Sequence, residues 1–329
     1  MPLVLAAPDK FRGTASGVEV AAAVARAATA AGWQCDQAPV ADGGEGILEA
    51  LGGAVRTATV HGPLGHPVEA EWRMRGDAAV IEMAKASGLL LAGGPEGNDA
   101  VGASTAGTGE LIATAVTAGA RRVIVGMGGS ATTDGGWPCL ETLEPHSRLK
   151  GVDLVAACDV TTRFIEAAEV FAPQKGASPA QVALLRRRLE RLAQVYRDDF
   201  GVDVQALAGS GAAGGLAGGL AAVGARLVPG FDLVADAIDL AERAEAADLV
   251  VTGEGYLDDQ SFHGKSVGGV IDLAGDAGKP VLIIAGDVAP EVAGQVEVTS
   301  LVERFGRQRA LADTVACIEE IVRERLARS

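Results

Sequence analysis

Short apolar runs rich in β-branched residues alternate with helical patterns along most of the chain. After the first run, Ser16 and Glu19 form a capping box, which predicts a helix that ends at Gly32. Strands that alternate with helices predict an α/β fold with mostly parallel sheets. The predicted strands cover residues 3–7, 78–83, 123–127, 153–158, 249–252 and 281–285.

The clearest helix pattern begins after Ser178, a typical N-cap residue. Pro179 suits the first helical position, and Gln181 completes a capping box. Arginines lie on the polar face, which we interpret as solvent-exposed rather than as a binding patch. Apolar side chains recur at helical spacing on the other face, at Val182, Leu185, Leu189, Leu192 and Tyr196.

An uncharged stretch at residues 204–225 has glycines at GxxxG spacing, namely Gly211, Gly215 and Gly219. Such spacing also occurs in membrane helices, but this stretch contains too few large aliphatic side chains to favour lipid. We therefore predict a glycine loop that opens a tightly packed helix, and a protein without a membrane partner.

Composition narrows the class of protein. The 329 residues include 28 basic and 43 acidic side chains, a formal charge of −15, which argues against nucleic acid as a partner. This length predicts two domains. The four cysteines form no C-x-x-C pair, as expected of reduced thiols in the cytoplasm, and the four histidines lack zinc spacing. Glycine is abundant at 45 residues.

The strongest candidate for chemistry is the glycine-rich segment 126–136, directly after a predicted strand. Its backbone N–H groups suit a phosphate, its hydroxyl residues add donors, and Asp134 could hold Mg²⁺. The segment also satisfies G-x-G-x-x-A, the dinucleotide fingerprint, but Gly135, Gly136 and Pro138 would break the helix that should follow. A phosphate or substrate loop is favoured, and a dinucleotide site or a tight turn stays open.

Other loops also combine glycine with charge. Segment 41–46 holds Asp42, which is either a general base or metal ligand, or part of a solvated turn. Segment 209–214 is a literal G-x-G-x-x-G without a preceding strand, so helix packing is as plausible as phosphate contact. Segment 252–258 follows a strand, and the Gly-Lys-Ser at 264–266 lacks the first glycine of a Walker A loop. Three of only six lysines lie in such loops: Lys10, Lys175 and Lys265.

Taken together, these segments resemble the bacterial class I glycerate kinase family. The chain is similar to a shortened member, with fewer residues between Trp137 and Asp153, a different loop at 161–165, Tyr256 where arginine is common and Ala106 where an aromatic residue is common. The matching segments run in the family's order over nearly the whole chain: 7–13, 41–46, 62–65, 81–84, 87–89, 107–112, 128–136, 158–160, 173–177, 211–215 and 252–255.

The resemblance implies ATP- and Mg²⁺-dependent phosphorylation of D-glycerate at O2, which gives 2-phosphoglycerate and ADP. It also implies two α/β domains, one flavodoxin- or Rossmann-like and built from both chain ends, with an active-site cleft between them. We expect residues 1–62 plus 240–329 in that domain and residues 63–239 in the other.

The resemblance also implies roles for individual residues. Asp42 would be the base or a Mg²⁺ ligand, and Lys10, Arg12 and Lys175 would meet the substrate carboxylate or the transferring phosphoryl group. The catalytic candidates are Asp42, Lys10 and Lys175. The substrate-binding candidates are Asp9, Arg12, Gly43, Gly44, Glu45, Gly128, Gly129, Ser130, Thr132 and Asp134. The nucleotide-binding candidates are Gly211, Gly214, Gly215, Glu254 and Lys265. The Mg²⁺ ligand candidates are Asp159, Asp134 and Glu254.

Two other functions stay open at this point. The shortened middle favours a kinase of another small hydroxy acid or polyol on the same scaffold, and the glycine fingerprint leaves room for an NAD(P)-binding, dehydrogenase-like protein. We expect a small-molecule substrate and a monomer or homodimer.

Overall fold

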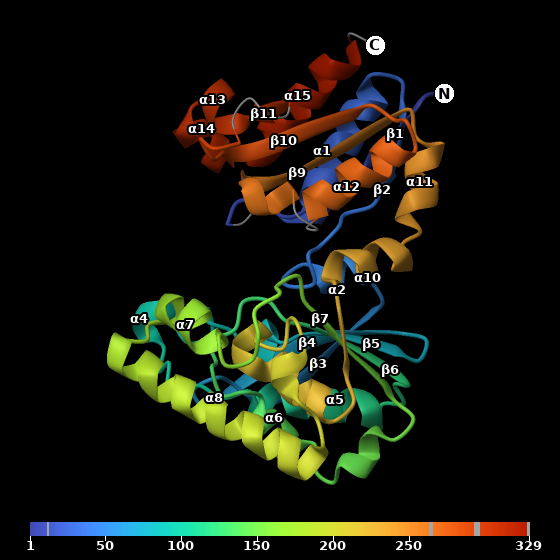
Figure 1. Ribbon diagram of the computed structural model, residues 1–329. Coiled ribbons are helices and arrows are strands. Elements are labelled where there is room, and N and C mark those ends of the chain that lie inside the picture. Colours follow the sequence, from blue (N-terminus) through green and yellow to red (C-terminus); the bar gives the residue numbers. More distant parts are fainter. Residues whose placement is uncertain (12, 263–265, 293–296, 328–329) are drawn as a thin grey trace. The chain divides into compact units, whose positions relative to one another are not determined.

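The chain forms two compact units, which are described separately (Figure 1). The computed structural model describes residues 1–11, 13–262, 266–292 and 297–327. Unit 1 comprises Met1–Asp42, Glu49–Leu51 and Phe231–Ser329, and unit 2 comprises Gly43–Leu48 and Gly52–Gly230.

The expected borders at residues 62 and 240 differ from this division. Residues 54–61 form an edge strand of the sheet in unit 2. Phe231 is buried in a core cluster of unit 1. Strand pairing and burial therefore set the division nearer to Asp42 and Gly230 than the family resemblance suggested.

Unit 1 contains a five-stranded parallel sheet in the order β11-β10-β9-β1-β2. Counted within the unit, this is the order 2-1-3-4-5 of flavodoxin-like folds. The prediction of an α/β fold with a flavodoxin-like part built from both chain ends is thus confirmed. The strands are β1 (Leu3–Ala6), β2 (Gln34–Gln37), β9 (Leu249–Leu257), β10 (Val281–Val288) and β11 (Val298–Ser300).

Helices cover both faces of this sheet, because alternate side chains of a strand point to opposite faces. Val4 and Ala6 of β1 pack with α1, α13, α14 and α15, whereas Leu5 packs with α10, α11 and α12. The capping box predicted at Ser16 is present. The bounds are α1 (Gly17–Ala30), α10 (Gly230–Ala237), α11 (Leu240–Ala246), η5 (Asp259–Phe262), α12 (Ser266–Asp276), α13 (Leu301–Phe305), α14 (Arg307–Ala312) and α15 (Thr314–Ala327).

Unit 2 contains a six-stranded mixed sheet in the order β3-β4-β5-β6-β7-β8. The first three strands pair antiparallel, which the sequence did not predict, because β3 buries few side chains and therefore lacks an apolar run. The remaining pairs are parallel. The strands are β3 (Ala54–His61), β4 (Pro67–Arg75), β5 (Ala78–Glu82), β6 (Arg122–Gly126), β7 (Asp153–Ala157) and β8 (Arg226–Val228).

The long helix predicted after Ser178 is present with its capping box, and it ends at Gly201 in a left-handed conformation. Leu185, Leu189 and Tyr196 are buried in the core of unit 2. The helices are α3 (Ala84–Ser87), α4 (Gly94–Gly97), α5 (Ala106–Thr117), α6 (Trp137–Thr142), η1 (His146–Leu149), α7 (Ala167–Phe171), η2 (Pro173–Lys175), α8 (Pro179–Phe200), η3 (Val204–Ala206), η4 (Ala212–Gly215) and α9 (Leu216–Ala222); α2 (Ile47–Leu51) is shared between the units.

The uncharged stretch at 204–225 forms η3, η4 and the fully buried helix α9. A Cβ on Gly218 would collide with the Phe164 ring, so the glycine allows the close packing that the sequence predicted. Among the described helices, none is long and apolar enough to cross a membrane.

Candidate active site

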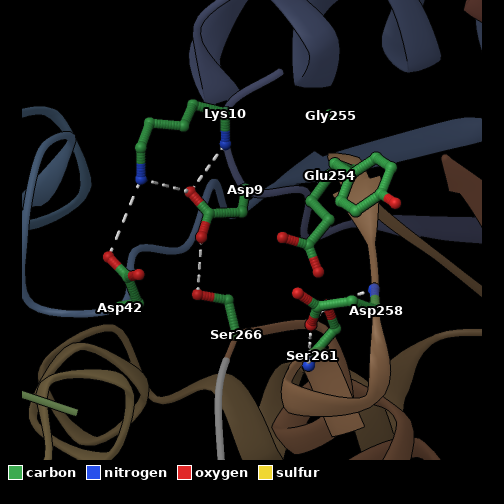
Figure 2. A pocket seen from close by; sticks show the side chains of 9 residues that line it. Asp9, Lys10, Asp42, Glu254, Gly255, Asp258, Ser261 and Ser266 are labelled. Carbon is green, nitrogen blue, oxygen red and sulfur yellow. Dashed lines mark hydrogen bonds and ion pairs between the residues drawn. The ribbon is translucent and has the colours of Figure 1, made fainter. Parts of the chain in front are cut away.

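Unit 1 contains a pocket of about 410 Å³ at the carboxyl ends of β1 and β9. The strand order reverses there, because β2 follows on one side of β1 and β9 lies on the other. Flavodoxin-like sheets bind ligands at this switch point. The residues that line the pocket are Asp9, Lys10, Asp42, Glu254, Gly255, Tyr256, Asp258, Ser261 and Ser266 (Figure 2).

The pairing of β9 explains how Glu254 reaches the pocket. Strand β9 pairs with β1 only as far as Val251 but with β10 as far as Leu257. The predicted strand ends at Thr252, whereas the observed strand continues past the end of β1. Its extension carries Glu254 into the pocket, and Figure 2 shows this carboxylate and that of Asp258 extending into the space beside Asp9.

Asp9 is the most deeply buried charged residue of the pocket, with 4% of its surface exposed. Its Oδ1 accepts a 2.6 Å hydrogen bond from the Lys10 backbone, and its Oδ2 accepts a 2.7 Å hydrogen bond from Ser266 Oγ. Burial raises the pKa of Asp9, although the Lys10 charge and the Ser266 hydrogen bond oppose the shift. Both oxygens therefore have protein partners, which fix the carboxylate rigidly.

Lys10 lies between two carboxylates. Its Nζ is 3.5 Å from Asp9 Oδ1 and 3.7 Å from Asp42 Oδ1, and Asp42 is half-buried. The structure thus brings four predicted residues, Asp9, Lys10, Asp42 and Glu254, together in one pocket.

Five lining residues were not among the candidates: Gly255, Tyr256, Asp258, Ser261 and Ser266. Tyr256 is 54% exposed, and Ser261 donates to Asp258 Oδ1. All five follow Glu254 within a short segment, so the signal was their position after a strand at the switch point. They were missed because the strand was predicted to end too early.

In unit 2, the Lys175 side chain is enclosed by the predicted phosphate loop. Its Nζ donates to Ser130 Oγ at 2.7 Å and to the Thr132 carbonyl at 2.6 Å. Only 3% of the residue is exposed, and burial lowers the pKa of Lys175 to about 7. Lys175 and Ser130 are thus direct neighbours.

Both oxygens of the Asp134 carboxylate accept hydrogen bonds from nearby loop and helix residues. Oδ2 accepts hydrogen bonds from the backbone N–H and the hydroxyl of Thr105, and Oδ1 accepts from the Gly136 backbone. Burial raises the pKa of Asp134. Because these bonds tie α5 to the turn before α6, we assign Asp134 to loop architecture and do not retain it as a Mg²⁺ ligand or substrate contact.

The two predicted glycine loops pack against each other. A Cβ on Gly128 would lie 2.6 Å from Gly44 Cα, and one on Gly43 would lie 2.7 Å from Gly230 Cα. The Met127 N–H donates to the Gly43 carbonyl at 3.0 Å. Gly129 has φ +69°, a left-handed conformation that favours glycine. Close backbone packing therefore accounts for glycine here, without any need for phosphate.

Glu82 holds the same loop and was not predicted. Its Oε1 accepts hydrogen bonds from Gly46 N at 2.8 Å and Leu48 N at 3.3 Å, at the start of α2. Burial raises the pKa of Glu82. The only signal in the sequence was an acidic residue at the end of an apolar run.

The second glycine set is a packing feature. Gly211, Gly214 and Gly215 are buried, and a Cβ on Gly214 would collide with the Thr132 carbonyl. Thr132 itself is fully buried. Of the two interpretations open for this segment, the structure agrees with helix and loop packing, since these glycines present no exposed backbone to a nucleotide.

Two of the remaining candidates, Asp159 and Glu45, lie in unit 2. Asp159 Oδ1 accepts a 2.7 Å hydrogen bond from Gly230 N, and Glu45 is exposed. Arg12 and Lys265 lie outside the described residues. Within the described part of the chain, no three His, Cys, Asp or Glu side chains converge as a complete metal site.

Residues 4–145 and 140–328 match the Glycerate kinase family. The chain belongs to this family. The glycerate kinase family resemblance inferred from the sequence is thereby confirmed.

A glycerate 2-kinase of Escherichia coli K12 is 39% identical over 88% of this chain and 86% of its own. An uncharacterized protein of Mycobacterium bovis is 41% identical over 94% and 87%. A crystal structure from Salmonella typhimurium LT2, provisionally named glycerate kinase 2, superposes with a TM-score of 0.82 at 34% identity, covering 100% of this chain and 98% of its own.

Proposed function

We propose that this glycerate kinase family member transfers the γ-phosphoryl group of ATP to O2 of D-glycerate and releases 2-phosphoglycerate and ADP. The observation that carries the proposal is the pocket at the switch point of unit 1, where Asp42 and Glu254 lie near one buried carboxylate and one lysine. The names of the relatives support glycerate as the acceptor.

The acceptor hydroxyl must lose its proton as its oxygen bonds to phosphorus. Asp42 is the proposed base, because it is half-buried and its Oδ1 lies 3.7 Å from the Lys10 ammonium, which orients it. The new O–P bond forms as the bond from the γ-phosphorus to the bridging oxygen breaks, and ADP leaves with that electron pair. Lys10 can offset the negative charge of the phosphoryl oxygens, which is the main task in phosphoryl transfer.

The donor set of the pocket fits magnesium bound together with a nucleotide. Mg²⁺ usually takes one or two carboxylates, and water and substrate phosphates complete its shell, so a full protein cage is not required. Glu254, whose carboxylate extends into the pocket, would hold the ion. Bound there, Mg²⁺ would neutralise phosphate charge in a pocket lined by four carboxylates.

The test is an ADP-release assay with MgATP and a panel of small hydroxy acids and polyols, with the product position read by phosphorus NMR. We expect turnover with D-glycerate and a phosphorus signal coupled to the C2 proton. Turnover with another acceptor but not with D-glycerate would replace the substrate assignment. A thermal shift with NAD(P) and none with MgATP would overturn the kinase assignment.

We also propose a cytoplasmic location. All four cysteines, Cys35, Cys139, Cys158 and Cys317, are free thiols. Free thiols suit a reducing compartment.

A further inference from the structure

Lys175 is too enclosed to reach a ligand itself. Only 3% of its surface is exposed, and its Nζ has two short hydrogen bonds to protein oxygens, at 2.7 Å and 2.6 Å. Ser130 retains 8% of its surface. Of the two residues, Ser130 is thus the more exposed.

The direction of the hydrogen bond between them follows from chemistry. When Lys175 is charged, its ammonium has three donors and no acceptor, so Ser130 Oγ accepts from Nζ. The hydroxyl hydrogen of Ser130 is then left to donate elsewhere, and no described residue accepts it. A hydroxyl that accepts from a cation is also a stronger donor, because linked hydrogen bonds polarise one another.

Asn98 holds the segments that carry Lys175 and Ser130 together. Its Nδ2 donates to the Lys175 carbonyl at 2.9 Å and to the Ala131 carbonyl at 3.0 Å. One amide group thus links the backbone of η2 to the backbone beside Ser130. Gly176 has φ +93°, and a Cβ there would collide with the Pro95 carbonyl, which locks η2 against α4.

Asp134 is the charged group that acts on the buried Lys175 side chain. Asp134 favours its charged form, but the Asp134 oxygens are hydrogen-bonded to Thr105 and Gly136. Two glutamates on the helices that pack against η2 are exposed, Glu96 in α4 and Glu169 in α7, and Glu169 pairs with Arg186.

We propose that Lys175 acts on an anionic ligand through Ser130: the buried ammonium holds the Ser130 hydroxyl so that its hydrogen is donated to a carboxylate or phosphate oxygen. Lys175 and Asn98 are then positioning residues, and Ser130 is the contact. The inference rests on the proposed function for the identity of the ligand, D-glycerate or ATP, but the hydrogen-bond geometry does not depend on that identity.

A double-mutant cycle tests this relay. Ser130→Ala, Lys175→Met and the double variant are compared in KM for D-glycerate, KM for ATP and kcat. We expect each single variant to raise one KM by about ten-fold or more, as for loss of a charge-assisted hydrogen bond. The KM of the double variant should not exceed the higher KM of the two single variants, because both changes remove the same contact. The KM that rises identifies the carboxylate or the phosphate as the ligand group.

If the KM increases of the two single variants multiply in the double variant, Lys175 contacts the ligand independently and the relay is overturned. Unchanged KM values in the single variants would overturn it too. Lys175→Gln, which can still donate to the Thr132 carbonyl, replaces Lys175→Met if that variant does not fold. Lys150→Met is the matched control, because Lys150 is an exposed lysine of unit 2. Asn98→Ala should raise the same KM by a smaller factor.

A separate binding measurement distinguishes this inference from the proposed function. Inorganic phosphate and D-glycerate are titrated calorimetrically into the wild type and Ser130→Ala. If the wild type does not phosphorylate D-glycerate but binds either anion more tightly than the variant, the proposed function fails and the relay stands. If neither anion binds the wild type, or if both proteins bind equally, the relay is overturned.

Discussion

Ser266 Oγ donates a 2.7 Å hydrogen bond to Asp9 Oδ2, and this contact joins the loop after the first strand to the start of α12. Both residues line the pocket at the switch point. The bond favours the ionised form of Asp9, against the burial that raises its pKa. A serine far along the chain thus helps to keep the pocket carboxylate charged.

Replacing Ser266 with alanine should therefore raise the pKa of Asp9 further. The acid limb of the kcat/KM profile should move to higher pH, and the free energy of unfolding should fall by about 1.5–3 kcal/mol, since a buried hydrogen bond to a charged group is lost. Assays across pH and urea denaturation measure the two effects. Ser147→Ala, at an exposed serine, is the control. An unmoved acid limb would mean that Asp9 ionisation does not limit turnover.

Asp42→Asn should lower kcat by about 100-fold or more, as for loss of a general base, and leave KM for D-glycerate within a few-fold. The amide keeps the size of the side chain but cannot take up the hydroxyl proton at neutral pH. Steady-state kinetics check this, with Asp272→Asn at an exposed position of α12 as the control. Near-normal turnover in the Asn variant would remove Asp42 from the role of base.

Local patterns pointed to Lys10, in a glycine-bounded loop, and to Glu254, at a strand end, whereas Asp9 came from the family resemblance. Asp9 and Lys10 come just after β1, and Glu254 lies on the strand beside it. Ser261 and Ser266 could not be found in this way. Their place depends on how far β9 extends beyond β1, and this extension is set by pairing with β10, which no local pattern reports.

Glycine was the least informative signal, for a physical reason. A missing side chain allows backbone to approach a phosphate, but it equally allows backbone to approach backbone. Gly128 and Gly43 serve the second purpose, since each faces main-chain atoms of a neighbouring segment. Only the tertiary fold distinguishes the two cases, whereas the capped helices at Ser16 and Ser178 were predictable because their partners are local.

Gly128→Ala should destabilise unit 2 by several kcal/mol, because the new Cβ would lie 2.6 Å from Gly44 Cα and 3.2 Å from the Glu45 nitrogen. The matched control is Gly275→Ala in α12, where a Cβ meets nothing within 4 Å. The control should be stabilised by roughly 0.5–1 kcal/mol, as alanine is the better helix former. Urea unfolding of both variants gives the comparison, and equal stability of the two would contradict the interlocked glycine loops.

Lys175 should make stability depend on pH between about 7, its pKa in the folded protein, and 10.5, its ordinary value. Within this window the unfolded chain binds more protons at Lys175 than the folded one, so the Lys175 contribution to stability rises with pH. Below about pH 7 the folded protein must bury the charge, at a cost on the order of 5 kcal/mol, since each unit of pKa is worth ~1.4 kcal/mol. Lys175→Met removes that cost. Its stability relative to the wild type should therefore be highest near pH 6 and should fall steadily toward pH 9, whatever constant penalty the lost hydrogen bonds add. Urea midpoints of both proteins at pH 6, 7.5 and 9 measure the trend, and a difference that stays flat across this range would show that Lys175 keeps its ordinary charge when buried.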